Sequence, residues 1–244
     1  MTDGTASGEQ HTYGDEAARA YQFSRDDQDA YAMESLARAK RAVSDGSFAS
    51  EIVPVTVKTR AGESEIAVDE QPGKADPKKI PNLKPAFAKD GTVTAATSAS
   101  ISDGAAALAI AGEAAVKARG LNPIARIVGQ ASYAGKPGLF TSAPVHAIRR
   151  LFEKTGWSAR DVDLFEINEA FANVAMIAMK EHGLSHDVVN VNGGACALGH
   201  PIGASSARIV VTLINALKAR GLKRGVASLC IGGGEATAVA VEVV

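Results

Sequence analysis

The sequence is poor in the features that define several protein classes. Its 244 residues include only two cysteines, one tryptophan and 5% aromatic residues. Two cysteines, Cys196 and Cys230, are too few for a disulfide framework, so we expect a reducing, cytoplasmic setting. No apolar run reaches the roughly 20 residues that a membrane span needs. The first residues also lack the apolar stretch of a secretory signal, so no membrane contact is predicted.

An excess of charge of one sign is lacking as well. The formal net charge is −1, with 26 basic and 27 acidic residues, which gives no electrostatic support for binding to nucleic acid or to an anionic membrane. What the chain does have is small and apolar residues, with 24 glycines and a hydrophobic share of 46%. Such a composition suits an α/β protein whose helices pack closely on a sheet. The polar residues 1–10 are predicted to form a flexible start.

Short apolar runs alternate with helical patterns from residue 124 onward. Strands are expected over 124–133, 163–167, 188–191, 225–231 and 237–243, and helices over 144–156, 168–182 and 205–220. This alternation predicts an α/β fold with a layered sheet. Upstream, the pattern predicts two helices within 15–43, with Ser24 capping one of them, an irregular segment over 69–90, and an alanine-rich helix over 103–119 that Gly120 ends.

Three loops that carry chemically active groups follow predicted strands. They are Asn168-Glu-Ala-Phe171, Gly199-His-Pro-Ile-Gly203 and Cys230-Ile-Gly-Gly-Gly234. Because strand ends and helix starts converge at the ligand crevice of α/β sheets, the loops are expected to meet. Together they supply a thiol, an imidazole, a carboxamide and backbone N–H groups, which suit acyl-transfer or enolate chemistry. Taken singly, each also has a structural explanation, namely a buried cysteine, a helix cap or a glycine turn.

Two pairs of residues have the i, i+4 spacing of helical metal ligands. Cys196 pairs with His200 in this way, and His182 pairs with His186. Neither pair has a third ligand nearby, and glycine and proline interrupt the helices that would align them. We therefore predict no metal site. The glycine run after Cys230 also lacks the Lys-Ser/Thr pattern of a phosphate loop.

In combination, the three loops resemble those of the thiolase family. The shared motifs are Asn-Glu-Ala-Phe-Ala, Asn-Gly-Gly-x-x-Ala-Leu-Gly-His-Pro-Ile-Gly-Ala-Ser and Cys-Ile-Gly-Gly-Gly, in this order. The resemblance continues upstream through 83–87, 90–94 and 102–107, and so covers nearly the whole chain. It implies a thiolase-like layered αβα domain with a mixed sheet. It also implies an acyltransferase of fatty acid metabolism, an acetyl-CoA C-acetyltransferase that reversibly condenses two acetyl-CoA into acetoacetyl-CoA and CoA.

The resemblance assigns catalytic roles to four residues. His200 corresponds to the histidine that activates the nucleophilic cysteine and helps bind the thioester oxygen. Asn168 corresponds to the asparagine that holds a water molecule of the same oxyanion hole. Cys230 corresponds to the second catalytic cysteine, which exchanges a proton with the α-carbon of acetyl-CoA. Gly232 corresponds to a backbone donor to the other oxyanion. We expect glycine N–H groups and His200 to bring the pKa of Cys230 near the working pH.

Four further residues are assigned to the substrate by the same resemblance. Ala170 and Phe171 correspond to the pair that flanks the pantetheine arm of CoA. Phe140 falls near the acyl pocket, where a bulky side chain is expected to favour short acyl groups. Ala99 stands where many thiolases have a serine that contacts CoA. Coenzyme A thioesters are the implied substrates, and no separate cofactor is expected.

The acyl-accepting cysteine of thiolases has no counterpart among Cys196 and Cys230. Thiolases carry it in an N-terminal domain, so we expect this chain to be a C-terminal portion that lacks the nucleophile-bearing domain. The implied organisation has three parts. Residues 1–101 form the loop region with a remnant of the N-terminal domain, residues 102–121 form the closing helix of that domain, and residues 122–244 form a complete C-terminal domain.

Two other interpretations remain open. The first is a non-catalytic thiolase-like module that binds acyl-CoA or serves as a structural subunit, which the absence of the nucleophile favours. The second is a condensing enzyme of the ketoacyl-synthase type, which shares the fold but not the terminal Cys-Ile-Gly-Gly-Gly. A homo-oligomer is expected by resemblance, as is a partner chain that carries the N-terminal thiolase domain.

Overall fold

A four-stranded sheet forms the centre of the computed structural model, which describes residues 6–60 and 62–244. Its strands are β3 (Ala125–Ala134), β4 (Leu164–Ile167), β5 (Arg224–Ile231) and β6 (Glu235–Val243), in the order β3-β6-β5-β4. Strand β6 pairs antiparallel with β3 and with β5, whereas β4 pairs parallel with β5. The sheet is therefore mixed, and the predicted α/β class is confirmed.

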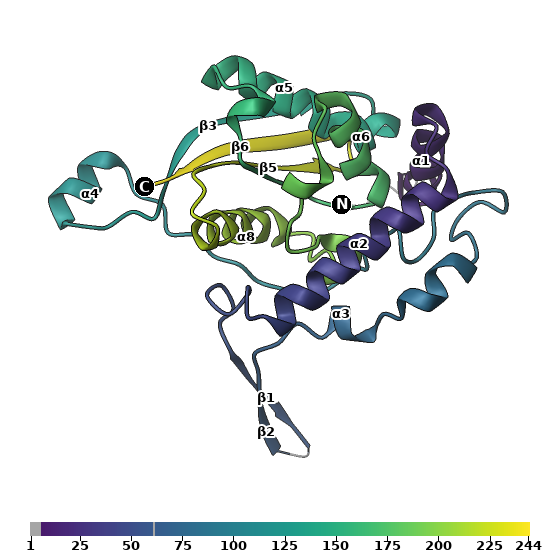
Figure 1. Cartoon of the computed structure of the whole chain (residues 1–244), viewed down its shortest axis with the longest axis horizontal. Helices are drawn as coiled ribbons and strands as arrows, with labels where there is room; N and C mark the ends of the chain where they lie inside the picture. The colour runs from purple at the N-terminus through teal and green to yellow at the C-terminus, as the bar shows by residue number, and fades with distance from the viewer. Residues whose placement is uncertain (1–5, 61) are drawn as a thin grey trace.

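Helices cover both faces of this sheet (Figure 1). Helices α5 (Ala143–Thr155) and α6 (Ala172–His182) lie on one face, and α8 (Ser205–Ala219) lies on the other. Each helix buries a stripe of apolar residues three or four positions apart, such as Ile148 and Leu151 on α5. On α8 the stripe is Ile209, Leu213 and Leu217. The result is the three-layered αβα arrangement that the sequence predicted.

The N-terminal helices pack beside the layered domain. They are α1 (Ala6–Tyr21) and α2 (Arg25–Ser44). A capping box starts α2: the Asp27 N–H donates to Ser24 Oγ at 3.0 Å, and the Ser24 N–H donates to Asp27 Oδ2 at 2.8 Å. The predicted pair of helices with Ser24 as a cap is confirmed. Residues 1–5 of the predicted flexible start lie outside the described residues, whereas residues 6–10 begin α1, so that prediction is wrong there.

The segment between α2 and the sheet is mostly irregular, as predicted for 69–90. It contains a hairpin of β1 (Val55–Thr59) and β2 (Gly62–Ile66), the short helix α3 (Gln71–Lys74) and the 3-10 turn η1 (Pro77–Asn82). The hairpin is exposed along both strands and projects from the rest of the molecule (Figure 1). Further short elements are η2 (Pro137–Ser142), η3 (Ala159–Asp161), η4 (His186–Val188) and α7 (Ala195–Leu198).

The alanine-rich helix predicted over 103–119, and with it the closing helix over 102–121, is mostly absent. Residues 102–112 have no regular structure, and only α4 (Glu113–Arg119) is helical. Helices in proteins are stabilised mainly by packing of one face. Residues 102–106 lie beside 201–204, but no residue of 103–119 is buried, and Ile110 is 75% exposed. Gly120 does end the helix, with φ of 60°.

The strand predicted over 188–191 is also wrong. Val189 makes one parallel bridge to Phe165, and Asn190 then turns into the left-handed region with φ of 48°. The Asn190 side chain takes the place of a strand partner: its Oδ1 accepts from the Ile167 N–H and its Nδ2 donates to the Ile167 carbonyl, both at 2.8 Å. A side chain thus satisfies the edge of β4 where a strand would have done so.

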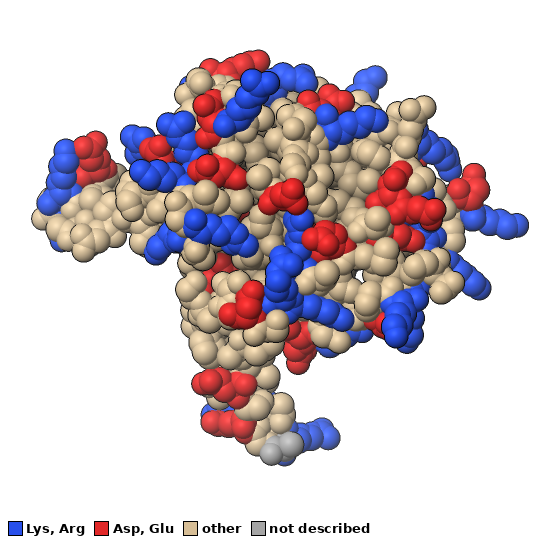
Figure 2. Space-filling view, viewed as in Figure 1, with Lys and Arg blue, Asp and Glu red and all other residues tan. Residues whose placement is uncertain are grey.

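Charged side chains of both signs are interspersed over the surface shown in Figure 2. The face in that view has no large area of a single sign of charge, which agrees with the net charge of −1. No helix within the described ranges is both long and apolar enough to cross a membrane.

Candidate active site

The ends of β4 and β5 place two of the predicted site residues at one edge of the sheet. Ile167 and Ser228 are register partners, and the Asn168 N–H donates to the Ser228 carbonyl at 2.9 Å. Cys230 lies two residues further along β5. Because β4 and β5 are parallel, Asn168 and Cys230 both sit at the carboxyl end of the sheet, where α/β enzymes bind ligands.

His200 is brought to the same edge by a backbone strap formed by residues 97–101. The His200 N–H donates to the Ser100 carbonyl at 2.9 Å, and Ile101 bridges to His200. The strap also holds the loop after β4, since the Ala172 N–H donates to the Thr97 carbonyl at 2.8 Å. One short segment therefore fixes the loop after β4 and the loop of His200 relative to each other.

The His200 imidazole contacts a polar group on each side. Its Nε2 lies 3.4 Å from Asn168 Nδ2, and its Nδ1 lies 2.5 Å from Ser205 Oγ. The Asn168 amide nitrogen can only donate, so Nε2 is the accepting nitrogen and Nδ1 carries the proton that Ser205 Oγ accepts. The Ser205 hydroxyl in turn donates to the Pro201 carbonyl at 3.1 Å. Burial, and then the Arg208 charge, lower the pKa of His200. The ring is thus suited to accept a proton at Nε2.

Asn168 is almost fully buried, with 1% of its surface exposed. It does not begin a helix, because α6 starts only at Ala172 and Phe171 remains extended. Its Oδ1 has no hydrogen-bond partner among the described residues. A buried amide oxygen of this kind is available to accept from a water molecule or a ligand.

Cys230 sits in an apolar environment. Its cluster contains Val93, Phe140, Phe171 and Val174. Burial raises the pKa of the Cys230 thiol to about 12, since only its own backbone hydrogen bond favours the thiolate. The expectation that neighbouring groups bring this pKa near the working pH is therefore wrong, and in this structure Cys230 is a neutral thiol, a proton donor.

The four predicted substrate-binding residues lie together. The Ala99 N–H donates to the Ala170 carbonyl at 3.1 Å, and Ser98 bridges to Phe171. The rings of Phe140 and Phe171 are 6.2 Å apart and tilted by 53°. Phe140, Phe171 and Ala170 share a cluster with Cys230, and Ala99 joins it to the strap. Gly232 lies apart from them, exposed in the turn that joins β5 to β6.

Cys196 does not have the environment of an activated nucleophile. Its Sγ lies 3.9 Å from the Glu169 carbonyl oxygen. Burial and the Glu169 charge raise the pKa of Cys196 well above its ordinary value. Within the described ranges, no group of three His, Cys, Asp or Glu residues could hold a metal ion.

Two residues of the site escaped the sequence analysis. Ser205 orients His200, and its only sequence signal is a place five residues after the histidine. Glu169 is buried and anchors the loops, because its carboxylate accepts from four donors at 2.8–3.0 Å: the Tyr31 hydroxyl, the Ser35 hydroxyl, Asn190 Nδ2 and the Cys196 N–H. Its signal was its place in the Asn-Glu-Ala-Phe motif.

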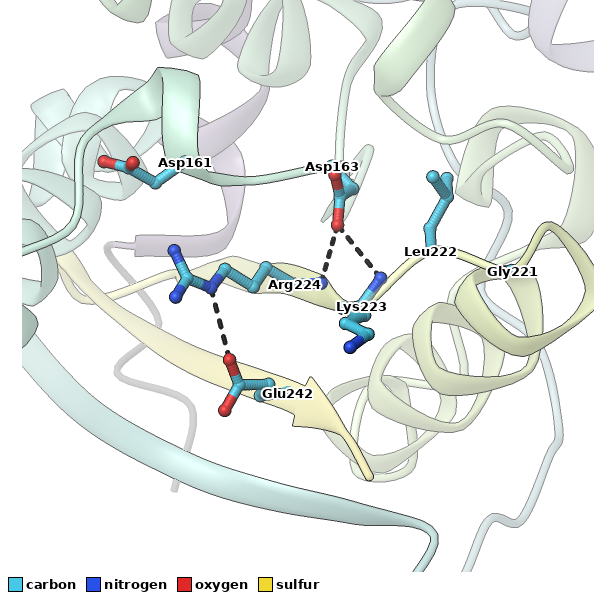
Figure 3. A pocket seen from close by; sticks show the side chains of 7 residues that line it. All are labelled: Asp161, Asp163, Gly221, Leu222, Lys223, Arg224 and Glu242. Atoms are coloured by element: carbon cyan, nitrogen blue, oxygen red, sulfur yellow. Dashed lines mark hydrogen bonds and ion pairs between the residues drawn. The ribbon is translucent and has the colours of Figure 1, made fainter.

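Two open depressions mark the surface near the sheet. One of about 510 Å³ is lined by charged residues, among them Asp163, Arg224 and Glu242 (Figure 3). It lies where β5 begins and β6 ends, so it is at the opposite end of the sheet from Asn168 and Cys230. The other, of about 410 Å³, lies between 102–106 and 201–204, and its lining begins at Pro201, the residue after His200.

Comparisons with known proteins point to one family. The family model described as the C-terminal domain of thiolase matches residues 121–243, and that of the N-terminal domain matches residues 5–114. The acetyl-CoA acetyltransferase of Rhizobium meliloti is 46% identical over 227 residues, which cover 92% of this chain and 58% of the relative. That of Shinella zoogloeoides is 43% identical over 244 residues, covering 99% and 62%.

Solved structures give the same result. The acetyl-CoA acetyltransferase of Bacillus anthracis superposes with a TM-score of 0.92 at 43% identity, covering 97% of this chain and 60% of that one. The Acat5 thiolase of Ascaris suum, in complex with coenzyme A, gives 0.86 at 38% identity, covering 96% and 60%. The chain therefore spans about 60% of the length of these relatives.

Proposed function

The chain belongs to the thiolase family, and from this premise we propose that it supplies part of the active site of an acetyl-CoA C-acetyltransferase. The reaction is the reversible Claisen condensation of two acetyl-CoA into acetoacetyl-CoA and CoA. The names of the similar proteins support this choice of substrate. The observation that carries the proposal is the contact of Asn168 with His200 at the sheet edge where Cys230 also lies.

Acyl transfer begins with a nucleophilic thiol, which the proposal places on a partner that carries an N-terminal thiolase domain. Nε2 of His200 takes the proton of that thiol as its sulfur attacks the carbonyl carbon of acetyl-CoA. The resulting N–H, and a water molecule held by Asn168 Oδ1, then donate to the oxyanion. One such donor is typically worth about 3–4 kcal/mol. Collapse of the intermediate breaks the bond between the carbonyl carbon and the CoA sulfur, and His200 returns the proton to the departing CoA.

Condensation and its reverse use Cys230. In synthesis its thiolate removes a proton from the α-carbon of the second acetyl-CoA, and the carbanion attacks the acyl carbon, releasing the partner's thiolate. In thiolysis the Cys230 thiol returns a proton to the departing carbanion. The neutral thiol of this structure is the state needed for thiolysis. Backbone N–H donation from Gly232 to the enolate oxygen completes this half of the mechanism.

The walls of the proposed pocket suit a small acyl group. Phe140 and Phe171 are both buried beside Cys230. Their rings occupy the volume that a longer acyl chain would require, so we assign acetyl and acetoacetyl groups to this site. Ala99 and Ala170 would flank the pantetheine arm of CoA. No cofactor beyond the CoA thioester is proposed. We also propose a cytoplasmic setting, which the two free cysteines favour, and a homo-oligomer, as the resemblance to thiolases implies.

Thiolysis of acetoacetyl-CoA by CoA tests the proposal. The purified chain is assayed alone and with a thiolase N-terminal domain that carries the nucleophilic cysteine, in wild-type, Cys230→Ser and Cys196→Ser forms. We expect turnover only in the mixture, its loss in Cys230→Ser, and its retention in the matched control Cys196→Ser. Full activity in Cys230→Ser would remove this residue from the mechanism. Robust turnover by the chain alone would overturn the assignment of the nucleophile to a partner.

A non-catalytic module that binds acyl-CoA is the second candidate. It is favoured by one observation, namely that the pKa of both cysteines is raised, so neither is an activated nucleophile. Calorimetric titration with CoA distinguishes the two. Binding of CoA without turnover in the mixture supports the module, whereas turnover supports the enzyme.

A further inference from the structure

A largely buried pair of ionisable residues lies next to the candidate active site. Glu166 on β4 and Arg208 on α8 approach with Oε2 and Nη1 3.7 Å apart. The Glu166 side chain is 2% exposed and that of Arg208 is 20% exposed. The pair therefore joins a strand of the sheet to the helix that covers one of its faces, in a place largely closed to solvent.

The same strand and helix carry the groups that hold His200. Asn168 follows Glu166 by two residues, and Ser205 precedes Arg208 by three. Side chains two apart along an extended chain project to the same side, and side chains three apart on a helix share a face. Two bridges consequently join the end of β4 to the start of α8. One is Glu166 to Arg208, and the other runs from Asn168 through His200 to Ser205.

Several polar atoms of this region have no hydrogen-bond partner among the described residues. They are Glu166 Oε1, Arg208 Nη1 and Glu51 Oε2. Glu51, which follows α2, accepts from the Thr212 hydroxyl of α8 at 3.0 Å, and Arg208 lowers its pKa against the larger effect of burial. A pair whose polar atoms are only partly satisfied has no evident value as packing, because apolar residues would fill the space more stably. The position of this pair next to Asn168 and Ser205 fits a role in the candidate active site.

The charge on Glu166 depends on everything packed against it. Burial raises the pKa of Glu166 to about 8; among charged neighbours, Arg208 opposes the rise most, and Glu169 and Glu51 add to it. Arg220, at the end of α8, opposes it as well. Arg208 in turn lowers the pKa of His200. With a protonated Glu166, the Arg208 charge is uncompensated, which favours the neutral imidazole.

We propose that Glu166 and Arg208 form a positioning pair that sets the distance between Asn168 and His200 and holds the imidazole in its neutral form. The inference rests on the proposed function of His200 as a base. Neither residue of the pair touches substrate; both act through Asn168, Ser205 and His200. Ionisation of Glu166 then changes the pKa of the His200 imidazole, because both groups interact with the Arg208 charge.

NMR titration of the histidine side chains in the 244-residue chain tests the pair without any need for activity. The His200 signal is assigned by its loss in His200→Gln, since the chain has five histidines. The variants are Arg208→Met and Glu166→Gln, and the matched controls are Lys218→Met on the exposed side of α8 and Glu153→Gln on the surface. Thermal unfolding verifies that each variant is folded.

Two results are expected. Arg208→Met moves the midpoint of the His200 titration upward, and neither control does. The wild-type His200 signal shows a second inflection near pH 8 that Glu166→Gln abolishes. If Arg208→Met does not fold, the test depends on whether Glu166→Gln abolishes the second inflection. A His200 titration that is the same in wild type and in both pair variants would overturn the inference. Failure of the thiolysis assay while these shifts persist would overturn the proposed function and leave the positioning pair intact.

Discussion

Nδ1 of His200 lies 2.5 Å from Oγ of Ser205, and this contact determines which imidazole nitrogen is free to act. The Asn168 amide nitrogen can only donate to Nε2, so Nδ1 carries the imidazole proton and donates it to Ser205, whose hydroxyl donates to the Pro201 carbonyl. The chemistry of the loop thus depends on a hydroxyl in the first turn of α8. Without it, the ring is free to rotate and to change tautomer.

Replacement of Ser205 by alanine should therefore weaken catalysis more than binding. We expect kcat of thiolysis to fall about 10- to 100-fold, a part of the roughly 10²- to 10⁴-fold that a positioned acid or base contributes. KM should change little. Steady-state kinetics with the completed enzyme measure both constants. The neighbouring Ser206→Ala is the matched control, because Ser206 is exposed. Equal losses in the two variants would refute the role of Ser205.

The thiol of Cys230 should react slowly with thiol-specific reagents. With a pKa of about 12, about one thiol in 10,000 is ionised at pH 8, and the thiolate is the reactive form. We expect slow labelling by a disulfide reagent at pH 8 in the folded chain, and rapid labelling of two thiols after unfolding in guanidinium chloride. Mass spectrometry identifies the labelled residue. Rapid labelling of Cys230 in the folded chain would contradict its neutral state.

Glu169 should stabilise the loops strongly. Its carboxylate accepts from four buried donors, and hydrogen bonds to charged groups are each worth about 1.5–3 kcal/mol. In Glu169→Gln one oxygen becomes an NH₂ group that faces donors. We expect the free energy of unfolding to fall by about 2–4 kcal/mol in urea titrations. The exposed Glu153→Gln should stay within about 0.5 kcal/mol of wild type, and a similar value for Glu169→Gln would show that the carboxylate is not needed.

Gly199 should tolerate no side chain. Its φ of +85° is unfavourable for other residues, and an added Cβ would overlap the Ser102 hydroxyl of the strap region. The ψ of 169° at Gly199 puts the backbone in a region that essentially only glycine adopts. We expect Gly199→Ala to lower the free energy of unfolding by about 1–3 kcal/mol from backbone strain alone, and also to reduce activity by displacing His200. At Gly203 an added Cβ meets no atom within 4 Å. Gly203→Ala should thus keep wild-type stability; a loss as large as that of Gly199→Ala would indicate general loop sensitivity.

The elements that the sequence predicts well are those stabilised by their own pattern. The strands β3, β5 and β6 and the helix α8 agree with their predicted ranges to within about two residues. The wrongly predicted elements are those whose secondary structure depends on contacts with residues distant in the sequence. At 188–191, the Asn190 side chain takes the place of a strand partner. At 103–112, the alanine-rich sequence stays irregular because none of its residues is buried in a core that would stabilise a helix.

The candidate site divides in the same way. The positions of Asn168, His200 and Cys230 at one edge of the sheet were predictable because each stands in a short motif, while their catalytic roles stay predictions. Ser205 and Glu169 were not singled out, since their importance depends on which donors and acceptors the fold brings to them. The high pKa of Cys230 was missed for a related reason: the glycines beside it are visible in the sequence, but the phenylalanines that bury it come from 140 and 171.

The strap of residues 97–101 has a consequence for how the site opens. Its hydrogen bonds reach both the loop after β4 and the loop of His200, so detachment of the strap as a whole releases both loops. The amide protons of Ala99, Ala172 and His200 should consequently exchange with solvent deuterium as one cooperative unit. Their common exchange rate then reports how often the whole edge of the sheet comes apart, and a ligand that bridges the two loops should slow all three together.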